Sequence, residues 1–461
     1  MLATEVPPAT CDTGTDQQAA LRYTITATLD YTERVVTVRQ QIDYRNDTGR
    51  ALESLIFYVP PNDQPGVFSL ESVRLGEDNT PPESALVGPR LTVLLPAALL
   101  PGCRQTLYLD YTLHPPRMGT GYFPRRGYFG YSDRQFNLGL WTVTAAYFDG
   151  ENWLTPTAIN IGEQGVFPAA DFHVTLTVTH APSDLTVVGP GAVRQRGTTW
   201  EFTLPAGRDL TISLSDQFHR SVATAPNGIQ VEVYTLDDAQ PPPGATYNAP
   251  AHALITAAAA VELYADLYGN YPYERLVVLQ SDFPDGMEFS GLVFVGGEWF
   301  RSYTGDPACY LTLITAHEVA HQWWYSIVAN DQGTVPWLDE ALATYSELVF
   351  LEENYPGLVD WWWRFRVDGY FPEGYVDSTV YQFDSLRAYI NAVYLRGARL
   401  MHRLREVMGG EAFFAWLHDY VTTMRGRVAF PADLWAALPL DLREATFAPR
   451  AEYLRTPGYA E

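Results

Sequence analysis

The sequence predicts an α+β protein with a strand-rich first half and a mostly helical second half, and three observations predict it. Between Leu21 and His219, hydrophobic and polar residues alternate with the period of half-buried strands. A proline-rich connection follows, with three consecutive prolines at 241–243. Beyond this connection, stretches of good helix formers replace the alternation.

The first half has the pattern of a domain built from many short strands. The alternation is clear at 23–29, 107–111 and 174–178, and turn sequences such as the one at 46–49 separate these runs. Many short strands with few helical stretches indicate a β-sandwich-like sheet domain, which we expect to occupy residues 1–225.

One stretch of this half departs from the pattern. Residues 119–153 are rich in Gly, Tyr, Phe and Trp. They are expected to form either a long loop over a functional site or an aromatic loop packed on its own domain.

The second half begins with a helical stretch at 251–268 and a strand at 276–280, and helices dominate from residue 310 onward. We expect residues 226–461 to form a second domain, which is mostly helical.

Composition narrows the classes of function. The chain has 461 residues, of which 47% are hydrophobic and 18% are charged, so it can bury a large core. Its net charge of -24 excludes nucleic acid as an expected partner, because little is available to neutralise phosphates. No apolar run is long enough for a transmembrane helix, and the first residues lack the features of a signal peptide. We therefore expect a cytoplasmic protein or the trimmed, soluble part of an exported or membrane-anchored one.

The three cysteines are Cys11, Cys103 and Cys309. Their number is odd and their spacing fits neither a zinc ribbon nor a dense disulfide framework. Three buried or free thiols are the favoured interpretation, and a single disulfide is the alternative.

The segment His317-Glu318-Val319-Ala320-His321 lies in a run of good helix formers without Pro or Gly, from Tyr310 to Asp331. Positions i and i+4 of a helix share a face, so both imidazoles can reach one metal ion. Glu318 points about 100° away around the helix axis and can act on water instead. This is the HExxH arrangement of zinc peptidases.

A third ligand is predicted at Glu340, with eighteen residues (322–339) between it and His321. Pro336 suits the first turn of a second helix, and residues 355–357 (Tyr-Pro-Gly) end it. Two His and one Glu leave a fourth position open, as a catalytic zinc site requires. We therefore expect one Zn²⁺ on His317, His321 and Glu340, with Glu318 as the general base.

These segments, from His317 to Trp324 and from Trp337 to Tyr345, resemble the aminopeptidase N family of gluzincin peptidases. The resemblance covers about residues 21–438 and implies a thermolysin-like catalytic domain after the sheet domain. It implies a zinc aminopeptidase whose partners are peptides with a free amino end. The family's large carboxyl-terminal helical domain has no counterpart here, so a more open cleft is expected.

Two further motifs support the resemblance. Gly286-Met287-Glu288 is similar to the family's Gly-x-Met-Glu-Asn motif, although Phe289 stands where Asn is usual and the usual Ala beside the Gly is missing. The family uses that segment to bind substrate, and its Glu grips the α-amine, which implies this role for Glu288.

The second motif, residues 394–398 (Tyr-Leu-Arg-Gly-Ala), resembles the family's Tyr-x-x-Gly-Ala segment. This implies that Tyr394 donates a hydrogen bond to the tetrahedral intermediate, with Tyr389 as its competitor. Glu347 lies two turns after Glu340, and it either orients a metal ligand or is a solvated helix residue.

Two other functions stay open. One is a zinc endopeptidase with an open cleft, and the other is a binding scaffold of the same family with an idle site. The intact set of expected catalytic and metal-binding residues argues against the scaffold. The sequence gives no indication of the oligomeric state or of the preferred side chain.

Overall fold

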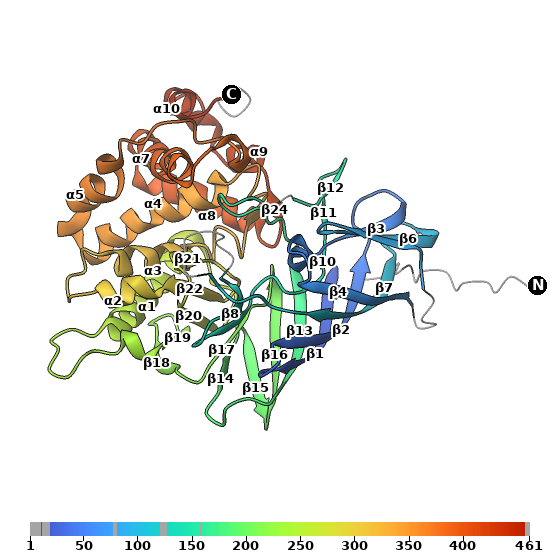
Figure 1. Ribbon diagram of the computed structural model, residues 1–461. Helices are drawn as coiled ribbons and strands as arrows, with labels where there is room; N and C mark the ends of the chain where they lie inside the picture. Colours follow the sequence, from blue (N-terminus) through green and yellow to red (C-terminus); the bar gives the residue numbers. More distant parts are fainter. Residues whose placement is uncertain (1–10, 12–18, 77–80, 120–126, 157, 457–461) are drawn as a thin grey trace, which may run out of the picture. The chain divides into compact units, whose positions relative to one another are not determined.

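The computed structural model describes residues 11, 19–76, 81–119, 127–156 and 158–456 (Figure 1). The chain forms two compact units. The first is made of residues within 1–118, 129–157 and 167–216, and the second of residues within 119–128, 158–166 and 217–461. Strands dominate the first unit, and helices together with a five-stranded sheet make up most of the second, which confirms the predicted α+β class.

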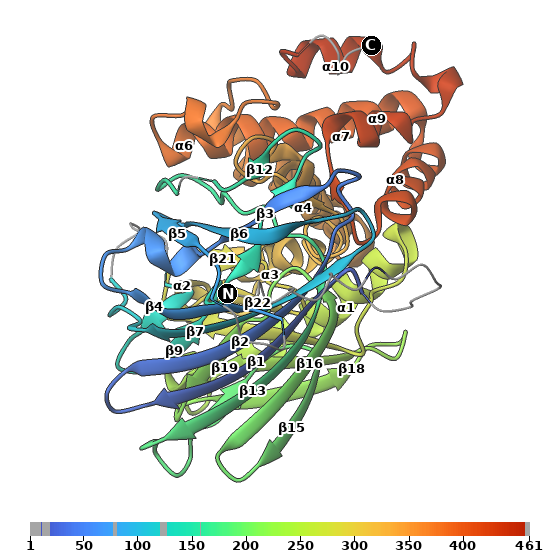
Figure 2. The same cartoon turned by 90° about the vertical axis from the view of Figure 1, so that its right-hand side faces the viewer.

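A seven-stranded sheet is the largest element of the first unit, with the order β15-β16-β13-β1-β2-β7-β4 (Figure 2). Neighbouring strands are antiparallel, except that β1 and β13 are parallel. The strands are β1 (Leu21–Asp30), β2 (Val35–Arg45), β4 (Phe68–Leu75), β7 (Arg104–Leu113), β13 (Ala170–Thr179), β15 (Ala192–Arg196) and β16 (Thr199–Gly207).

The strands predicted at 23–29, 107–111 and 174–178 are confirmed as parts of β1, β7 and β13. Every second side chain of β1 is buried, from Leu21 to Leu29, while most of those between them are exposed. The period-two pattern therefore reflects a sheet with one face against the core.

Smaller sheets complete the first unit, with the orders β10-β3-β6-β5, β14-β17-β9-β8 and β11-β12. The strands are β3 (Leu52–Tyr58), β5 (Ser84–Val87), β6 (Arg90–Leu99), β8 (Phe129–Tyr131), β9 (Phe136–Leu138), β10 (Thr144–Ala145), β11 (Tyr147–Phe148), β12 (Trp153–Leu154), β14 (Thr186–Val188) and β17 (Ile212–Ser215).

The aromatic stretch at 119–153 packs largely on its own domain, as one of the two expectations had it, but it contains strands where a loop was expected. Residues 129–153 contain the short strands β8 to β11 and the start of β12, and Phe136 and Trp141 are buried in the core. Strands of two or three residues are too short to leave an alternating pattern, which is why the sequence did not reveal them. Residues 120–126 lie outside the described part.

Cys11 and Cys103 form a disulfide bond, so the expectation of three unbonded thiols is wrong for these two residues. These residues are separated by 92 positions in the sequence, and an antiparallel bridge brings their backbones together. Spacing along the chain contains no information on such a long-range pairing. Cys309 is a free thiol in the second unit.

The second unit contains a five-stranded sheet with the order β18-β19-β20-β22-β21. The strands are β18 (His219–Thr224), β19 (Gln230–Thr235), β20 (Arg275–Ser281), β21 (Gly286–Met287) and β22 (Leu292–Gly296). The central strands β19, β20 and β22 are parallel and almost entirely buried. The sequences of β20 and β22 contain continuous apolar runs, as is typical of buried parallel strands, whereas β19 contains the buried Glu232. The short strand β21 pairs antiparallel with β22 at the edge of the sheet.

The helices of this unit are α1 (Ala249–Tyr268), α2 (Gly297–Ser302), α3 (Tyr310–Ala320), α4 (Trp337–Asn354), α5 (Val359–Trp362), α6 (Leu386–Tyr389), α7 (Arg396–Met408), α8 (Gly410–Met424), α9 (Pro431–Ala436) and α10 (Phe447–Tyr453). Two further strands of two residues each, β23 (Ala329–Asn330) and β24 (Val428–Ala429), pair in parallel. The predicted helix at 251–268, the strand at 276–280 and the helix that begins at Trp337 are confirmed.

Helix α3 is shorter than the run of helix formers that contains it. The run continues to Asp331, but the helix ends at Ala320 and His321 caps it. The Nδ1 atom of His321 lies 2.9 Å from the carbonyl oxygen of Trp324, and the chain turns there with Tyr325 at a φ of 156°. The helix ends here without a Pro or Gly, in a segment whose side chains are buried on both sides of the helix end.

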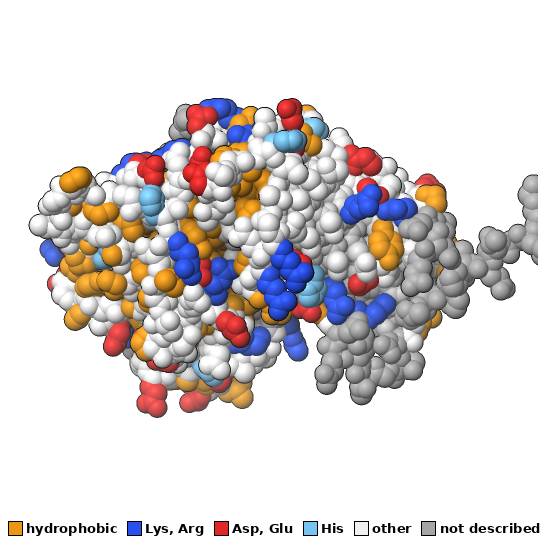
Figure 3. Space-filling view, turned by 90° about the horizontal axis from the view of Figure 1, so that it is seen from below, with side chains coloured by type: hydrophobic (Ala, Val, Ile, Leu, Met, Phe, Trp, Pro, Cys, Tyr) orange, Lys and Arg blue, Asp and Glu red, His pale blue; other side chains and the backbone are white. Residues whose placement is uncertain are grey.

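Acidic and basic side chains are both spread over the face shown in Figure 3, so the negative net charge is not gathered into one field on that face. Within the described ranges, no helix combines the length and the apolar character needed to cross a membrane.

Candidate metal and active site

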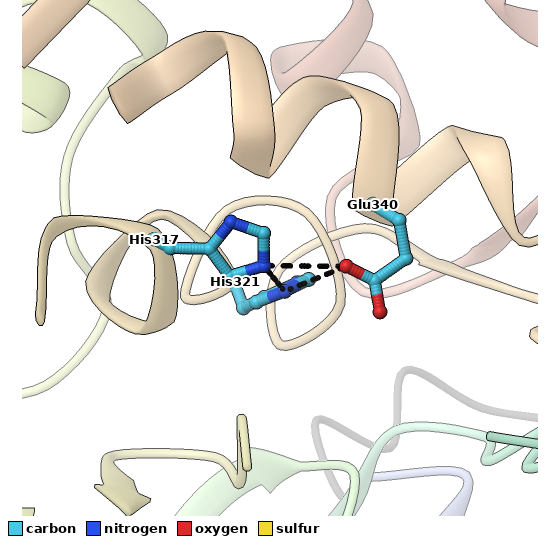
Figure 4. A group of neighbouring side chains, drawn as sticks. All are labelled: His317, His321 and Glu340. Carbon is cyan, nitrogen blue, oxygen red and sulfur yellow. Dashed lines mark hydrogen bonds and ion pairs between the residues drawn. The ribbon is translucent and has the colours of Figure 1, made fainter. Parts of the chain in front are cut away.

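The expected metal ligands converge on one point (Figure 4). His317 and His321 come from the carboxyl-terminal end of α3, and their Nε2 atoms lie 3.1 Å apart. Glu340, in the first turn of α4, places Oε2 at 3.3 Å from His317 Nε2 and at 3.5 Å from His321 Nε2. All three side chains are buried. Two imidazole nitrogens and one carboxylate oxygen facing a common centre are a donor set that suits Zn²⁺.

The other ring nitrogen of each histidine is also engaged. His317 Nδ1 lies 3.0 Å from Glu347 Oε1, and His321 Nδ1 lies 2.9 Å from the carbonyl oxygen of Trp324. Both partners accept hydrogen bonds, so they favour the tautomer that leaves Nε2 free to bind a metal.

Glu347 is fully buried, so the interpretation of this residue as a solvated helix position is wrong. Its carboxylate accepts two hydrogen bonds of 2.9 Å from Arg366 and one of 3.0 Å from Trp362 Nε1. Burial opposes the charge, but Arg366 outweighs it and lowers the pKa of Glu347 to about 2. A permanent carboxylate therefore faces His317. Arg366 was not predicted, because no motif links it to the histidines.

Glu318 lies beside the ligand set without belonging to it. It is buried, and its Oε2 has no hydrogen-bond partner among the described residues. Burial is the main cause that raises the pKa of Glu318 to about 8, with the charges of Glu288 and Glu340 acting in the same direction. A carboxylate of this kind can accept a proton near neutral pH.

Gly286 packs directly against Glu318. A Cβ atom on Gly286 would overlap the Glu318 carboxylate, so only glycine lets strand β21 approach the site this closely. The preceding residue, Asp285, has a φ of 74°, which is unusual for a residue with a side chain.

Glu288 lies beside Glu318 and His321, with carboxylate and imidazole atoms of the three within 4.8 Å of one another. It is buried, and its Oε1 accepts a hydrogen bond of 2.8 Å from Gln332 Nε2. Burial raises its pKa. Met287, on β21, is buried and pairs in register with Phe294.

Phe289 stands where the family motif has Asn, and it is fully buried. Its ring makes edge contacts with Phe294 at 6.0 Å and with Tyr128 at 5.6 Å. It is not among the residues that line the cavity. The residue that departs from the motif therefore belongs to the core and not to the cavity wall.

Tyr394 lies in a π-helical segment, Ile390–Leu395, and its ring is parallel to that of His317 at 5.9 Å between centroids. It lines the cavity, whereas Tyr389 is fully buried and packs against Tyr394 at 5.4 Å. The next motif residue, Gly397, touches Ala341 of α4, and a Cβ at Gly397 would overlap it. This close contact brings the Tyr394 segment to the helix that carries Glu340.

These residues surround a cavity of about 210 Å³ in the second unit. Its lining is Glu163, Asp285, Gly286, Glu288, Trp299, Tyr310, Ile314, His317, Glu318, His321, Glu340, Arg366, Tyr370, Leu386, Arg387, Ile390 and Tyr394.

Glu163 was not predicted. Its segment, residues 158–166, belongs to the second unit, and the Gly165 carbonyl accepts a hydrogen bond of 3.2 Å from the Gln332 backbone. Glu163 is more than a hundred positions away from the other acidic lining residues, and no motif surrounds it. Only the folded chain brings it to the cavity.

Known proteins resemble the chain over this region and beyond. The Peptidase family M1 domain matches residues 252–445. Human endoplasmic reticulum aminopeptidase 2 is 24% identical over 388 residues, which cover 78% of this chain and 38% of that protein. Aminopeptidase N of Lactococcus lactis subsp. lactis is 29% identical over 294 residues, 58% of this chain and 33% of that protein. The chain thus matches less than two fifths of the length of either relative.

Two solved structures have the same fold over nearly the whole chain. One is an M1 zinc metallopeptidase from Deinococcus radiodurans, with 20% identity and a TM-score of 0.66, covering 95% of this chain and 94% of that one. The other is a mutant of the Deinococcus radiodurans M1 zinc metallopeptidase bound to a Tyr-Ser-Ala substrate, with 20% identity, a TM-score of 0.66 and 96% coverage of both chains.

Proposed function

Because this chain belongs to the aminopeptidase N family, which is peptidase family M1, we propose that it is a zinc-dependent aminopeptidase. It removes residues from the amino end of peptides by hydrolysis. The observation that carries this proposal is the position of Glu288, a buried carboxylate beside the general base and the cluster of metal-binding side chains.

The residues that would hold zinc are His317, His321 and Glu340. Their donor atoms form a compact buried group, and three protein ligands leave one position open. When bound, zinc polarises the substrate carbonyl and lowers the pKa of water to about 7. Glu347 supports the site by fixing the orientation of His317.

Glu318 accepts a proton from the attacking water and returns it to the departing amine. Its unpartnered Oε2 and its raised pKa suit both halves of this transfer. Tyr394 donates a hydrogen bond from its hydroxyl group to the oxyanion that develops on the substrate carbonyl. Its place on the cavity wall, parallel to the His317 ring, supports this role over Tyr389, which is buried behind it.

Glu288 binds the α-ammonium group of the substrate. A buried carboxylate is costly without a cation, so an ammonium group that pairs with it is favoured over a neutral acylated nitrogen. Glu163 adds a second negative charge to the cavity lining. Fixing the amine there places the first peptide bond at Glu318, so one residue is released in each cycle.

The test is the release of chromophore from aminoacyl anilides with a free amine, beside their N-acetylated forms, by zinc-loaded protein. We expect only the free-amine compounds to be cleaved. Glu288→Gln should raise KM for them by about tenfold to a hundredfold, because the ammonium group loses its charged partner. Glu353→Gln, which changes an exposed carboxylate on α4, is the control and should behave like the wild type.

Two outcomes would contradict the proposal. Equal cleavage of free and acetylated compounds would indicate an endopeptidase and remove the role of Glu288. If zinc binds but the protein cleaves neither compounds nor longer peptides, and Glu318→Gln changes nothing, the site is an idle binding scaffold.

A further inference from the structure

The cavity has two chemically different ends. Glu288 marks one end, beside His321. The other end lies toward the start of α3, where Tyr310 and Ile314 line the cavity two turns and one turn before His317. A helix rises 1.5 Å per residue, so Tyr310 is about 10 Å from His317 along the axis.

Aromatic side chains form the wall at this far end. Trp299 packs on Tyr310 with 4.7 Å between ring centroids, and the hydroxyl groups of Tyr310 and Tyr370 are 3.0 Å apart. All three residues line the cavity. Side-chain contacts therefore link Trp299 of α2, Tyr310 of α3 and Tyr370, which follows α5, into one wall.

Arg387 completes this wall. Its guanidinium group lies 4.3 Å above the Tyr370 ring, and the side chain is exposed. Among the described residues it has no ion pair with any carboxylate. The second arginine of the lining, Arg366, is paired with Glu347. Arg387 therefore places an uncompensated positive charge at the far end of an otherwise acidic cavity.

A bound peptide would run between these two ends. With its amine on Glu288 and its first carbonyl near Glu318, the residues after the cleaved bond extend toward Tyr310. An extended residue spans about 3.3 to 3.6 Å, so a length of about 10 Å accommodates two or three residues. A negative group at the end of such a short peptide reaches the region of Arg387.

We propose that Arg387 binds the terminal carboxylate of short peptides, so that free tripeptides are better substrates than their carboxyl-terminal amides. This inference rests on the proposed aminopeptidase function. Arginine forms charge-assisted pairs with carboxylates, and contact with Tyr370 limits the freedom that the guanidinium loses on binding. Because the pair is partly exposed to water, the preference is several-fold to about tenfold.

The experiment compares kcat/KM for Leu-Ala-Ala and Leu-Ala-Ala-amide. The wild type should prefer the acid by up to about tenfold, mainly through KM, and added salt should reduce the preference. Arg387→Ala should bring the ratio of acid to amide close to one, and Arg387→Lys should restore part of it. Arg455→Ala is the matched control, because it removes an exposed guanidinium 4.8 Å above Tyr375, outside the cavity lining, and it should keep the wild-type ratio.

Equal rates for acid and amide in the wild type, or an unchanged ratio in Arg387→Ala, would overturn the inference. A leucyl anilide distinguishes this failure from a failure of the proposed function. If the anilide is cleaved while the acid and the amide have equal kcat/KM, only the proposed role of Arg387 is refuted. If the wild type cleaves neither the anilide nor any peptide, the proposed function itself falls, and this inference with it.

Discussion

The Glu347 carboxylate lies 3.0 Å from Nδ1 of His317, and the two residues are 30 positions apart in the sequence. The same carboxylate neutralises Arg366, which is also buried. One side chain therefore orients a metal ligand and compensates a buried cation.

Glu347→Gln should lower zinc affinity by about tenfold to a hundredfold, because an amide is a weaker acceptor for the His317 N–H. It should also cost about 3 to 5 kcal/mol of unfolding free energy, since Arg366 then has no buried counter-charge. Chelator competition and denaturant unfolding measure the two effects. Glu353→Gln on the same helix is the control, and equal behaviour of both variants would refute the role of Glu347.

Gly286→Ala should reduce kcat by about a hundredfold, because the new Cβ displaces the Glu318 carboxylate. Zinc affinity should change little, since Glu318 is not one of the expected ligands. Steady-state kinetics and zinc titration separate these effects. The matched control is Gly357→Ala, where an added Cβ meets no atom within 4 Å. A fully active Gly286→Ala variant would show that the overlap is relieved without moving the base.

Tyr394→Phe should lower kcat by about a hundredfold to a thousandfold with little change in KM, as expected for a hydrogen bond made to the developing oxyanion. Tyr389→Phe should retain most of the activity, because the Tyr389 ring is buried behind Tyr394. Kinetics on one anilide decide between them. The reverse order of effects would assign the oxyanion contact to Tyr389.

Zinc affinity should rise with pH between about pH 6 and about pH 9. Burial tends to lower the pKa of His317, but hydrogen bonds to Glu340 and Glu347 outweigh it and raise the pKa to about 9 without metal. Metal binding must therefore release a proton at neutral pH. Isothermal titration in buffers of different ionisation enthalpy measures this proton, and its absence at pH 7 would contradict the prediction.

The stability of the metal-free protein should follow the opposite trend. The folded pKa of His317 lies above its ordinary value of 6.5, so its stabilising contribution is complete below about pH 6.5. It is lost as the pH rises through about 9. The midpoint temperature of thermal unfolding of chelator-treated protein should therefore fall as the pH rises across this range. A midpoint temperature that rises would exclude the hydrogen bonds of His317 with Glu340 and Glu347 as the cause of the shift.

The predictable parts of the fold are those in which hydrophobic residues recur along the sequence with the same period as buried side chains recur along the element. The alternation at 23–29 matches β1 because one face of that strand packs on the core. The spacing of His317 and His321 brings both rings together because it equals about one helical turn. Both features depend only on neighbours along the chain.

The features that were not predictable depend on contacts between distant segments. Helix α3 ends at Ala320 within a buried segment that has no Pro or Gly, and the disulfide between Cys11 and Cys103 joins positions 92 residues apart. Glu163 and Arg387 reach the cavity only when the segments of the second unit pack together. No local pattern marks such residues, because the free energy that positions them comes from tertiary packing.

The contact between Gly397 and Ala341 constrains how this site can change during evolution. Because only the methyl group of Ala341 separates the Gly397 backbone from α4 there, the helix with Glu340 and the segment with Tyr394 are held at a close spacing. A mutation that adds volume at either position shifts both groups, so substitutions there must be compensated in pairs. New substrate preferences can then arise more readily on the cavity wall, at residues such as Trp299 and Arg387, while the chemistry at the centre is preserved.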